Sequence, residues 1–173
     1  MHNENIIIWF TGLPCSGKTS LSEILYNEIK KVGKKVILFD GDILRDGINS
    51  DLNFSKNDRT ENLRRTMELS KIFISEGYNV IVSQITPTND QRSMIKQNLE
   101  SKLKFIYLDC SLEKCIKRDV KGMYKKAMSG EISNFTGIND KYEIPTNADF
   151  IINTDDHDIN ESAKEIIKFF KSL

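Results

Sequence analysis

The sequence contains no apolar stretch that approaches the roughly 20 residues needed to cross a membrane. Its formal net charge is zero, with 25 basic and 25 acidic residues, which argues against binding to nucleic acid or to membrane surfaces through bulk charge. Residues 1–5 are polar and carry no Lys or Arg, unlike the start of a signal peptide. These absences predict a cytoplasmic protein that binds neither nucleic acid nor membranes.

Cysteine and histidine are scarce and scattered along the chain. The three cysteines, Cys15, Cys110 and Cys115, form no CxxC pair and have no cluster of histidines beside them. An odd number of cysteines fits a reducing compartment with free thiols in the core or in loops. His2 and His157 lie near the ends of the chain without obvious partners, so we expect both on the surface.

Five short runs of β-branched and aromatic residues alternate with five segments of helical periodicity. The runs are residues 6–10, 36–39, 80–82, 105–108 and 150–152, and the helical segments are residues 18–32, 61–76, 90–101, 112–121 and 159–170. Continuous apolar runs are typical of strands buried on both faces. The alternation predicts one α/β domain, residues 1–173, with a parallel sheet of about five strands and helices on both faces.

Residues 122–145 interrupt this alternation. The segment is polar, rich in Lys and bounded by glycine, and it is too long for a simple connection. We therefore expect it to form a lid over a binding site.

A glycine-bounded loop, GLPCSGKT at residues 12–19, fits the pattern GxxxxGK[ST] between a predicted strand and a predicted helix. In this arrangement backbone N–H groups surround phosphates, Lys18 reaches the β- and γ-phosphates, and the Thr19 hydroxyl binds Mg²⁺. No Asn-Lys-x-Asp motif of guanine-binding switches is present, so ATP with Mg²⁺ is the expected ligand. The residues expected to bind ATP are Gly12, Leu13, Pro14, Cys15, Ser16, Gly17, Lys18, Thr19 and Ser20. The sequence thus predicts a three-layer P-loop nucleoside triphosphate hydrolase or kinase fold.

Two carboxylates, Asp40 and Asp42, follow the second predicted strand, which we expect to lie beside the first. Ligands of open α/β sheets bind at the carboxyl ends of the strands. One carboxylate can hold the metal, directly or through water, while the other accepts a proton from an attacking hydroxyl. A plain turn is the alternative, since Asp and Gly favour turns. Downstream, Arg45, Phe54 and Arg59 suit an anionic, planar substrate, because guanidinium groups match phosphate or sulfate oxygens.

Three motifs extend this pattern along the chain: DGDxxR at residues 40–45, NFSxxDRxENxRR at 53–65, and DVKGxYKKAxxGEIxxFTGINDxYE at 119–143. Together they resemble adenylylsulfate (APS) kinases over residues 6–154. The resemblance implies a kinase that uses MgATP to phosphorylate the ribose 3′-hydroxyl of APS, giving PAPS and ADP, and that is often a homodimer.

The resemblance also implies roles for individual residues. Asp40 would lie beside the reacting hydroxyl, although whether Asp40 or Asp42 is the base stays open. Phe54 and Phe135 would enclose the base of the acceptor. The acceptor-binding residues implied by the resemblance and by position are Asp42, Arg45, Phe54, Arg59, Asn62, Gln84, Ile85, Thr86, Lys121 and Phe135.

The chain departs from the family at residues 84–88, QITPT, where members usually have Phe-Ile-Ser-Pro and an aromatic residue. Gln84 and Thr88 place polar groups where we expect the base of the acceptor. A related nucleotide acceptor, such as the cytidine diphosphoramidate of capsule biosynthesis, is therefore the alternative substrate. Thr86 stands at a position often described as phosphorylated in the family, but direct transfer between ATP and a ribose hydroxyl needs no such intermediate.

Overall fold

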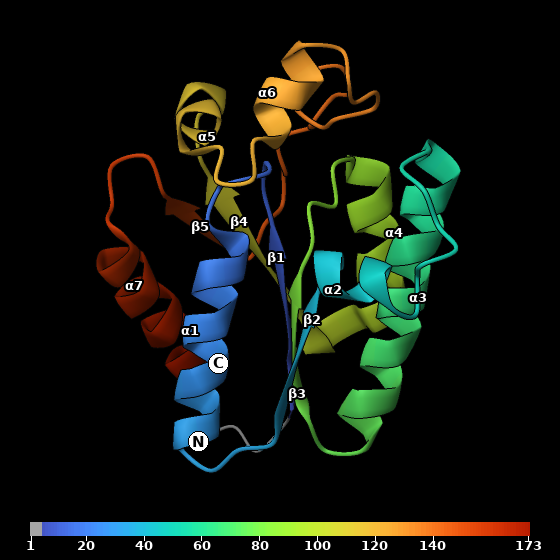
Figure 1. Cartoon of the computed structure of the whole chain (residues 1–173). Coiled ribbons are helices and arrows are strands. Elements are labelled where there is room, and N and C mark those ends of the chain that lie inside the picture. The colour runs from blue at the N-terminus through green and yellow to red at the C-terminus, as the bar shows by residue number, and fades with distance from the viewer. Residues whose placement is uncertain (1–4) are drawn as a thin grey trace.

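Five parallel strands form one sheet in the order β2-β3-β1-β4-β5 (Figure 1). The structure is a computed structural model that describes residues 5–173. The strands are β1 (Ile7–Thr11), β2 (Val36–Asp40), β3 (Asn79–Ser83), β4 (Leu103–Asp109) and β5 (Phe150–Asn153). The predicted three-layer α/β fold with a parallel sheet is confirmed.

Helices cover both faces of the sheet (Figure 1). The helices are α1 (Lys18–Lys31), α2 (Gly41–Asp46), α3 (Lys56–Ser75), α4 (Asn89–Leu99), α5 (Leu112–Arg118), α6 (Met123–Met128) and α7 (Ile159–Ser172), with a short 3₁₀ helix at Glu100–Lys102. One face carries α1 and α7, and the other carries α3 and α4. The short helices α5 and α6 stand above the carboxyl ends of the strands.

The strand β1 shows why its residues form a central strand. Ile7 and Trp9 pack into the apolar core beneath α3 and α4, whereas Ile8 and Phe10 pack into the core beneath α1 and α7. All four side chains are at most 1% exposed. Because both faces of the strand are buried, these four positions are all apolar, and the two-residue alternation of a half-exposed strand is absent.

The predicted neighbourhood of the second strand is wrong. The strand β2 pairs with β3, with Asp40 beside Ser83, and β3 in turn pairs with β1. The strand β3 is buried at all five positions, whereas the first three residues of β2 are only half-buried. Consecutive strands pair often but not always. Here β3 takes the interior position, where burial of its apolar side chains is favourable, and β2 lies at the edge of the sheet.

One helix begins earlier than its periodic segment, and another helix lies where none was expected. The helix α3 begins at Lys56, because the Ser55 side chain accepts a hydrogen bond from the Asp58 N–H and caps it. The helix α2 was not predicted; Asp40 caps it by accepting from the Asp42 N–H. Asp40 therefore both ends a strand and starts a helix, which fixes its carboxylate at the edge of the sheet.

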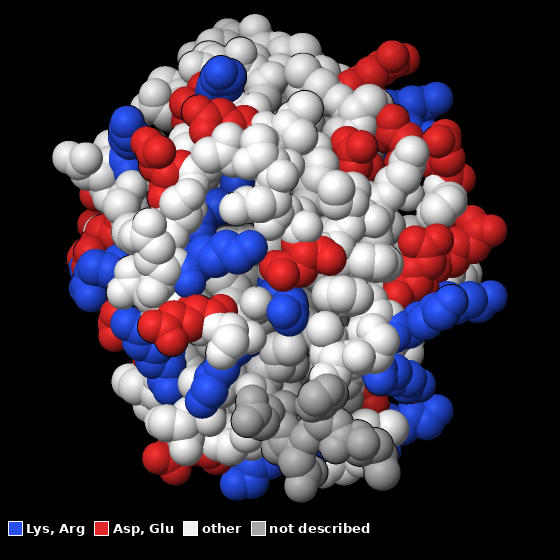
Figure 2. All heavy atoms as spheres, turned by 180° about the vertical axis from the view of Figure 1, so that it is seen from behind, with Lys and Arg blue, Asp and Glu red and all other residues white. Residues whose placement is uncertain are grey.

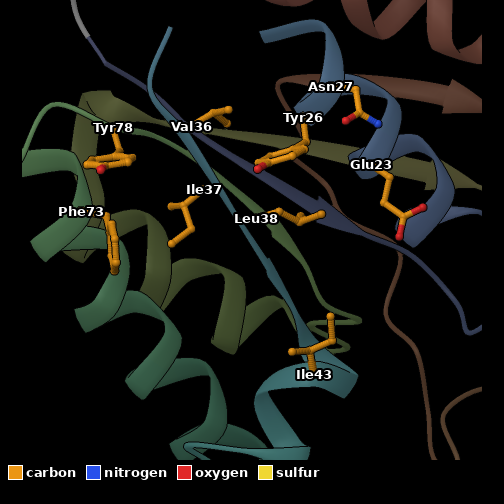
Figure 3. Close-up of a pocket in the computed structure, with 9 residues that line it drawn as sticks. All are labelled: Glu23, Tyr26, Asn27, Val36, Ile37, Leu38, Ile43, Phe73 and Tyr78. Atoms are coloured by element: carbon orange, nitrogen blue, oxygen red, sulfur yellow. The ribbon is translucent and has the colours of Figure 1, made fainter. Parts of the chain in front are cut away.

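A surface hollow of about 660 Å³ lies along the outer edge of β2 (Figure 3). Tyr26 of α1, Ile37 of β2 and Phe73 of α3 are among its lining residues.

Basic and acidic side chains both occur over the face seen from behind (Figure 2). Within residues 5–173 no helix combines the length and the apolar character that crossing a membrane requires.

Candidate active site

The phosphate loop connects β1 to α1, and its two glycines are required by geometry. Gly12 has φ +155°, and a Cβ there would lie 2.7 Å from Ser16 Oγ and 2.9 Å from the backbone oxygen of Leu108. Gly17, at the N-terminus of α1, has φ +103°. Side chains are strained at both positions, so the loop keeps glycine where its backbone must turn toward a ligand.

Lys18 points back into this loop. Its Nζ donates hydrogen bonds to the backbone oxygens of Gly12, at 3.0 Å, and Leu13, at 2.7 Å. The side chain is buried, and the loss of hydration lowers the pKa of Lys18 to about 8. A buried ammonium group whose partners are only carbonyl oxygens is well suited to bind an anion placed in the loop.

Thr19 and Asp40 bring two oxygens together beside the loop. Thr19 Oγ1 donates to Asp40 Oδ2 at 2.9 Å, and Asp40 Oδ1 accepts from the Asp42 N–H at 2.9 Å. Mg²⁺ prefers oxygen ligands such as hydroxyl and carboxylate groups. The Thr19–Asp40 pair therefore fits the expected metal. Both carboxylate oxygens of Asp40 also accept hydrogen bonds within the protein.

The second carboxylate of the motif is placed differently. Asp42 is exposed, and its Oδ2 accepts from Lys121 Nζ at 2.5 Å. Lys121 follows α5, so the ion pair joins α2 to a segment that is distant in the sequence. Asp42 is thus the carboxylate that is free to exchange its partner for a substrate group.

Two arginines and one aromatic ring form a charged cluster next to α2. The guanidinium carbon of Arg45 lies 4.5 Å from the centre of the Phe54 ring, and that of Arg59 lies 6.0 Å from it. Phe54 is 54% exposed, so its ring is available to a ligand. The structure therefore brings together these three predicted residues, with Asn62 one helical turn beyond Arg59 on α3.

Arg59 also holds the segment of residues 122–145 in place. Its Nη1 donates to Thr136 Oγ1 at 2.7 Å, its Nη2 donates to the Asn134 backbone oxygen, and it lies 3.8 Å from an oxygen of Asp140. Arg59, which we expect to bind an anionic substrate, therefore contacts residues 134–140 in this structure.

The same segment packs on the phosphate loop through aromatic contacts. The ring of Phe135 meets the ring of Tyr124 edge-on, with centroids 4.9 Å apart. Tyr124 is fully buried, and its hydroxyl donates to the Pro14 backbone oxygen at 3.0 Å. Contact of Phe135 with an acceptor base stays a prediction.

Gln84 and Thr88 use their polar groups inside the protein. Gln84 Nε2 donates to Thr66 Oγ1 at 2.9 Å, and Thr88 Oγ1 accepts from the Gln91 N–H and caps α4. The predicted recognition of a base by these two residues therefore gains no support from the structure.

Ile85 and Thr86 form a strained loop beneath the site. Thr86 has φ +47°, and its buried hydroxyl accepts from Trp9 Nε1 at 2.9 Å. The Ile85 backbone oxygen accepts from Thr11 Oγ1 at 2.6 Å. Because Thr86 is 1% exposed and its hydroxyl is already hydrogen-bonded to Trp9, it is poorly placed to receive a phosphoryl group.

Sequence reasoning missed Arg92, which is 3% exposed. Its Nη1 donates to the Thr86 backbone oxygen at 2.6 Å, and its Nη2 donates to Asn89 Oδ1 at 2.8 Å and to the Glu143 backbone oxygen at 2.5 Å. The guanidinium also lies 5.5 Å from the centre of the Tyr142 ring. The only available signal was its place on the inner face of a predicted helix, where a charged residue is unusual.

A parallel sheet with a phosphate loop between β1 and α1, a buried lysine in that loop and a Thr–Asp pair beside it define a P-loop kinase. The profile of the adenylylsulphate kinase family matches residues 4–153. The chain belongs to the adenylylsulphate kinase family.

Individual relatives agree with this assignment over nearly the whole chain. An adenylyl-sulfate kinase of Clostridium kluyveri is 41% identical over 166 residues, covering 96% of this chain and 83% of the relative. That of a Picosynechococcus species is 40% identical over 173 residues, covering 100% and 97%. The structure of a Mycobacterium tuberculosis APS kinase in complex with AMPPNP and APS has a TM-score of 0.92 at 36% identity, covering 97% of this chain and 98% of that one.

Proposed function

We propose that this protein transfers the γ-phosphoryl group of ATP to the ribose 3′-hydroxyl of adenylyl sulfate, giving PAPS and ADP. The observation that carries the proposal is the pairing of a complete phosphate loop with a cluster of arginines and an exposed phenylalanine on its acceptor side. Membership of the adenylylsulphate kinase family supports the choice of acceptor. The first site binds a triphosphate, and the second binds an anion that carries an aromatic base.

On the ATP side, Lys18 exchanges its two backbone partners for β- and γ-phosphate oxygens. The α1 N-terminus and the loop N–H groups from Gly12 onward then surround the phosphates. Thr19 and Asp40 would hold Mg²⁺, Asp40 directly or through water. When bound, the ion neutralises negative charge that develops on the transferring phosphoryl group.

On the acceptor side, Arg45, Arg59 and Asn62 bind the 5′ phosphosulfate anhydride through charged and amide donors. Phe54 and Phe135 enclose the base, because stacking on aromatic rings suits any planar heterocycle. The acceptor-side contacts also include the backbone of Ile85 and Thr86 and the ammonium group of Lys121.

We assign the proton acceptor to Asp42 and the metal site to Asp40. Asp40 accepts hydrogen bonds from Thr19 and from the first turn of α2, whereas the side chain of Asp42 forms only an exposed ion pair with Lys121. A general base must be able to reach the hydroxyl that it deprotonates. Asp42 meets this condition once Lys121 turns toward the anionic acceptor.

We further propose that residues 122–145 act as a lid on a single domain of residues 1–173. The segment already contacts the phosphate loop through Tyr124 and the acceptor side through Arg59. A lid that touches both sites excludes water from the transferring group when both substrates are bound.

The test is an ADP-release assay with MgATP and adenylyl sulfate, combined with ³¹P NMR of the product. We expect ADP release that depends on adenylyl sulfate, a new 3′-phosphomonoester signal, and no turnover by Lys18→Ala. Absence of acceptor-dependent ADP release by the wild-type protein would refute the proposed function.

A parallel reaction with cytidine diphosphoramidate tests the alternative acceptor. The polar residues that suggested this acceptor, Gln84 and Thr88, are engaged within the fold. We therefore expect a lower kcat/KM with the cytidine nucleotide. A preference for it would replace adenylyl sulfate as the substrate without changing the reaction type.

A further inference from the structure

A cluster of buried amide side chains lies behind the acceptor side of the site. Asn49, in the turn after α2, is fully buried; Asn62 of α3 is 6% exposed; and Gln84, which follows β3, is 5% exposed. Thr66, one turn beyond Asn62, is also fully buried. These four residues come from three separate segments of the chain, and their side chains form one hydrogen-bonded cluster.

The hydrogen bonds of the cluster converge on one atom. Asn62 Oδ1 accepts from Asn49 Nδ2 at 2.6 Å and lies 3.4 Å from Gln84 Nε2. Gln84 Nε2 also donates to Thr66 Oγ1 at 2.9 Å, and Thr66 in turn donates to the Asn62 backbone oxygen at 2.9 Å. Two buried side-chain donors therefore face the carbonyl end of the Asn62 amide.

This arrangement decides which end of the Asn62 amide is offered to a ligand. A carboxamide has one accepting end and one donating end. With Oδ1 turned inward, Nδ2 is the end that remains open, and it bonds to none of the groups in residues 5–173. A donor that faces outward attracts an anion, whereas the opposite orientation would place a carbonyl oxygen against it.

We propose that Asn49 and Gln84 are positioning residues that keep the Asn62 amide donor turned toward the anionic end of the acceptor. The proposal rests on the proposed function of Asn62 as an acceptor ligand. The oxygens Asn49 Oδ1 and Gln84 Oε1 have no partner among the described residues. Both side chains thus leave their own acceptors unpaired while their donors serve Asn62 and Thr66.

Gln84 can take this role because its side chain donates hydrogen bonds, whereas the family resemblance leads us to expect phenylalanine at this position. Phenylalanine at this position could fill the space but could not donate to Asn62 or Thr66. The glutamine therefore supplies a second donor to the Asn62 oxygen. Its effect on the acceptor is indirect, through the orientation of Asn62, and does not require contact with a base.

The decisive variant is Asn49→Asp. A carboxylate only accepts hydrogen bonds, so Asp at this position repels Asn62 Oδ1 and draws Nδ2 inward. We expect KM for adenylyl sulfate to rise about 10- to 100-fold, the range for one mispaired buried group. KM for ATP should change less than about twofold, because the phosphate loop is not involved.

Gln84→Leu is the second variant, since it introduces no buried charge and keeps a similar volume. We expect a smaller rise of about threefold in KM for adenylyl sulfate and an unchanged KM for ATP. Thermal unfolding of each variant separates a loss of stability from a loss of acceptor affinity. Unchanged acceptor KM in both variants, or an equal rise in both KM values, would overturn the proposal.

The orientation of Asn62 can also be measured without any acceptor. The side-chain NH₂ signals of Asn62, assigned by their loss in Asn62→Asp, should exchange rapidly with water in the wild-type protein and slowly in Asn49→Asp. Slow exchange in the wild-type protein would refute the inward orientation of Oδ1. A wild-type protein that shows rapid exchange but no turnover of adenylyl sulfate would instead refute the proposed function alone.

Discussion

Lys121 Nζ lies 2.5 Å from Asp42 Oδ2, although the two residues are 79 positions apart in the sequence. Their side chains are 67% and 73% exposed, so the ion pair is screened by water and contributes little stability. A weak pair of this kind breaks readily when an anionic ligand offers Lys121 a better partner. We therefore propose that binding of the acceptor to Lys121 releases the Asp42 carboxylate.

Replacing Asp42 by Asn should remove the proton acceptor and lower kcat by about 100-fold or more, the usual contribution of general base catalysis. KM for ATP should stay within about twofold, because Asp42 does not contact the phosphate loop. The matched variant Asp40→Asn should instead increase the Mg²⁺ concentration required for half-maximal rate. Steady-state kinetics at varied ATP and Mg²⁺ distinguish the two, and a reversed pattern would exchange the two roles.

Nucleotide binding should take up protons near pH 8. Burial lowers the pKa of Lys18 to about 8, so part of the free protein carries a neutral amine at that pH. Phosphate oxygens favour the ammonium form and raise the pKa again. Calorimetry of ADP binding in buffers of different ionisation enthalpy measures this uptake, which should vanish in Lys18→Met and at pH 6. Equal proton uptake by the variant would assign it to another group.

The same lowered pKa has a consequence for stability. Between about pH 8 and the ordinary Lys pKa of about 10.5, the unfolded chain binds more protons at this position than the folded protein does. The contribution of Lys18 to the free energy of unfolding should therefore rise with pH across that window. Comparison of urea unfolding of the wild-type protein and Lys18→Met at pH 7.5 and 9.5 isolates this contribution. A difference that is independent of pH would contradict the lowered pKa.

Residues 122–145 should gain protection from hydrogen exchange when ADP and adenylyl sulfate bind together. The segment is held to the phosphate loop by Tyr124 and to the acceptor side by Arg59, so ligands in both sites reinforce contacts at both ends. Hydrogen-exchange mass spectrometry with ADP alone, acceptor alone and both ligands provides the comparison. Identical protection in the free and doubly bound protein would argue against a lid.

Arg92→Lys should loosen the strained loop of Ile85 and Thr86 while keeping the charge. Lysine cannot donate simultaneously to Thr86, Asn89 and Glu143 in the fork geometry of arginine. We expect the free energy of unfolding to fall by about 1–3 kcal/mol, as for a buried group left unpaired. Urea denaturation measures this loss, with Lys96→Arg, at a half-buried position one turn further along α4, as the control. A loss below about 0.5 kcal/mol would show that the loop does not depend on Arg92.

The sequence predicts the local features of this fold well because they depend on short segments. The strand runs and the phosphate loop each follow from a few neighbouring residues. The position of β2 at the edge of the sheet depends instead on how much apolar surface β2 and β3 bury in the complete structure. No local pattern contains that comparison, so the predicted strand order is wrong.

The candidate site shows the same division. The motifs identified Lys18, Thr19 and Arg45 through residue type and spacing alone. Arg92 and Asn49 escaped notice because their importance comes from buried partners far away in the sequence. Gln84 was noticed for its chemistry, but only the three-dimensional structure shows that its donor faces Asn62 and Thr66.

The hydrogen bond from Trp9 to Thr86 gives the protein an internal optical probe. Trp9 is the only tryptophan of the chain, and its indole N–H contacts the strained loop that we place beneath the acceptor. Indole emission depends on the polarity and hydrogen bonding around the ring. Any movement of the loop as the acceptor enters should therefore change the emission of a single, unambiguous fluorophore, so that acceptor binding can be followed in real time without a label.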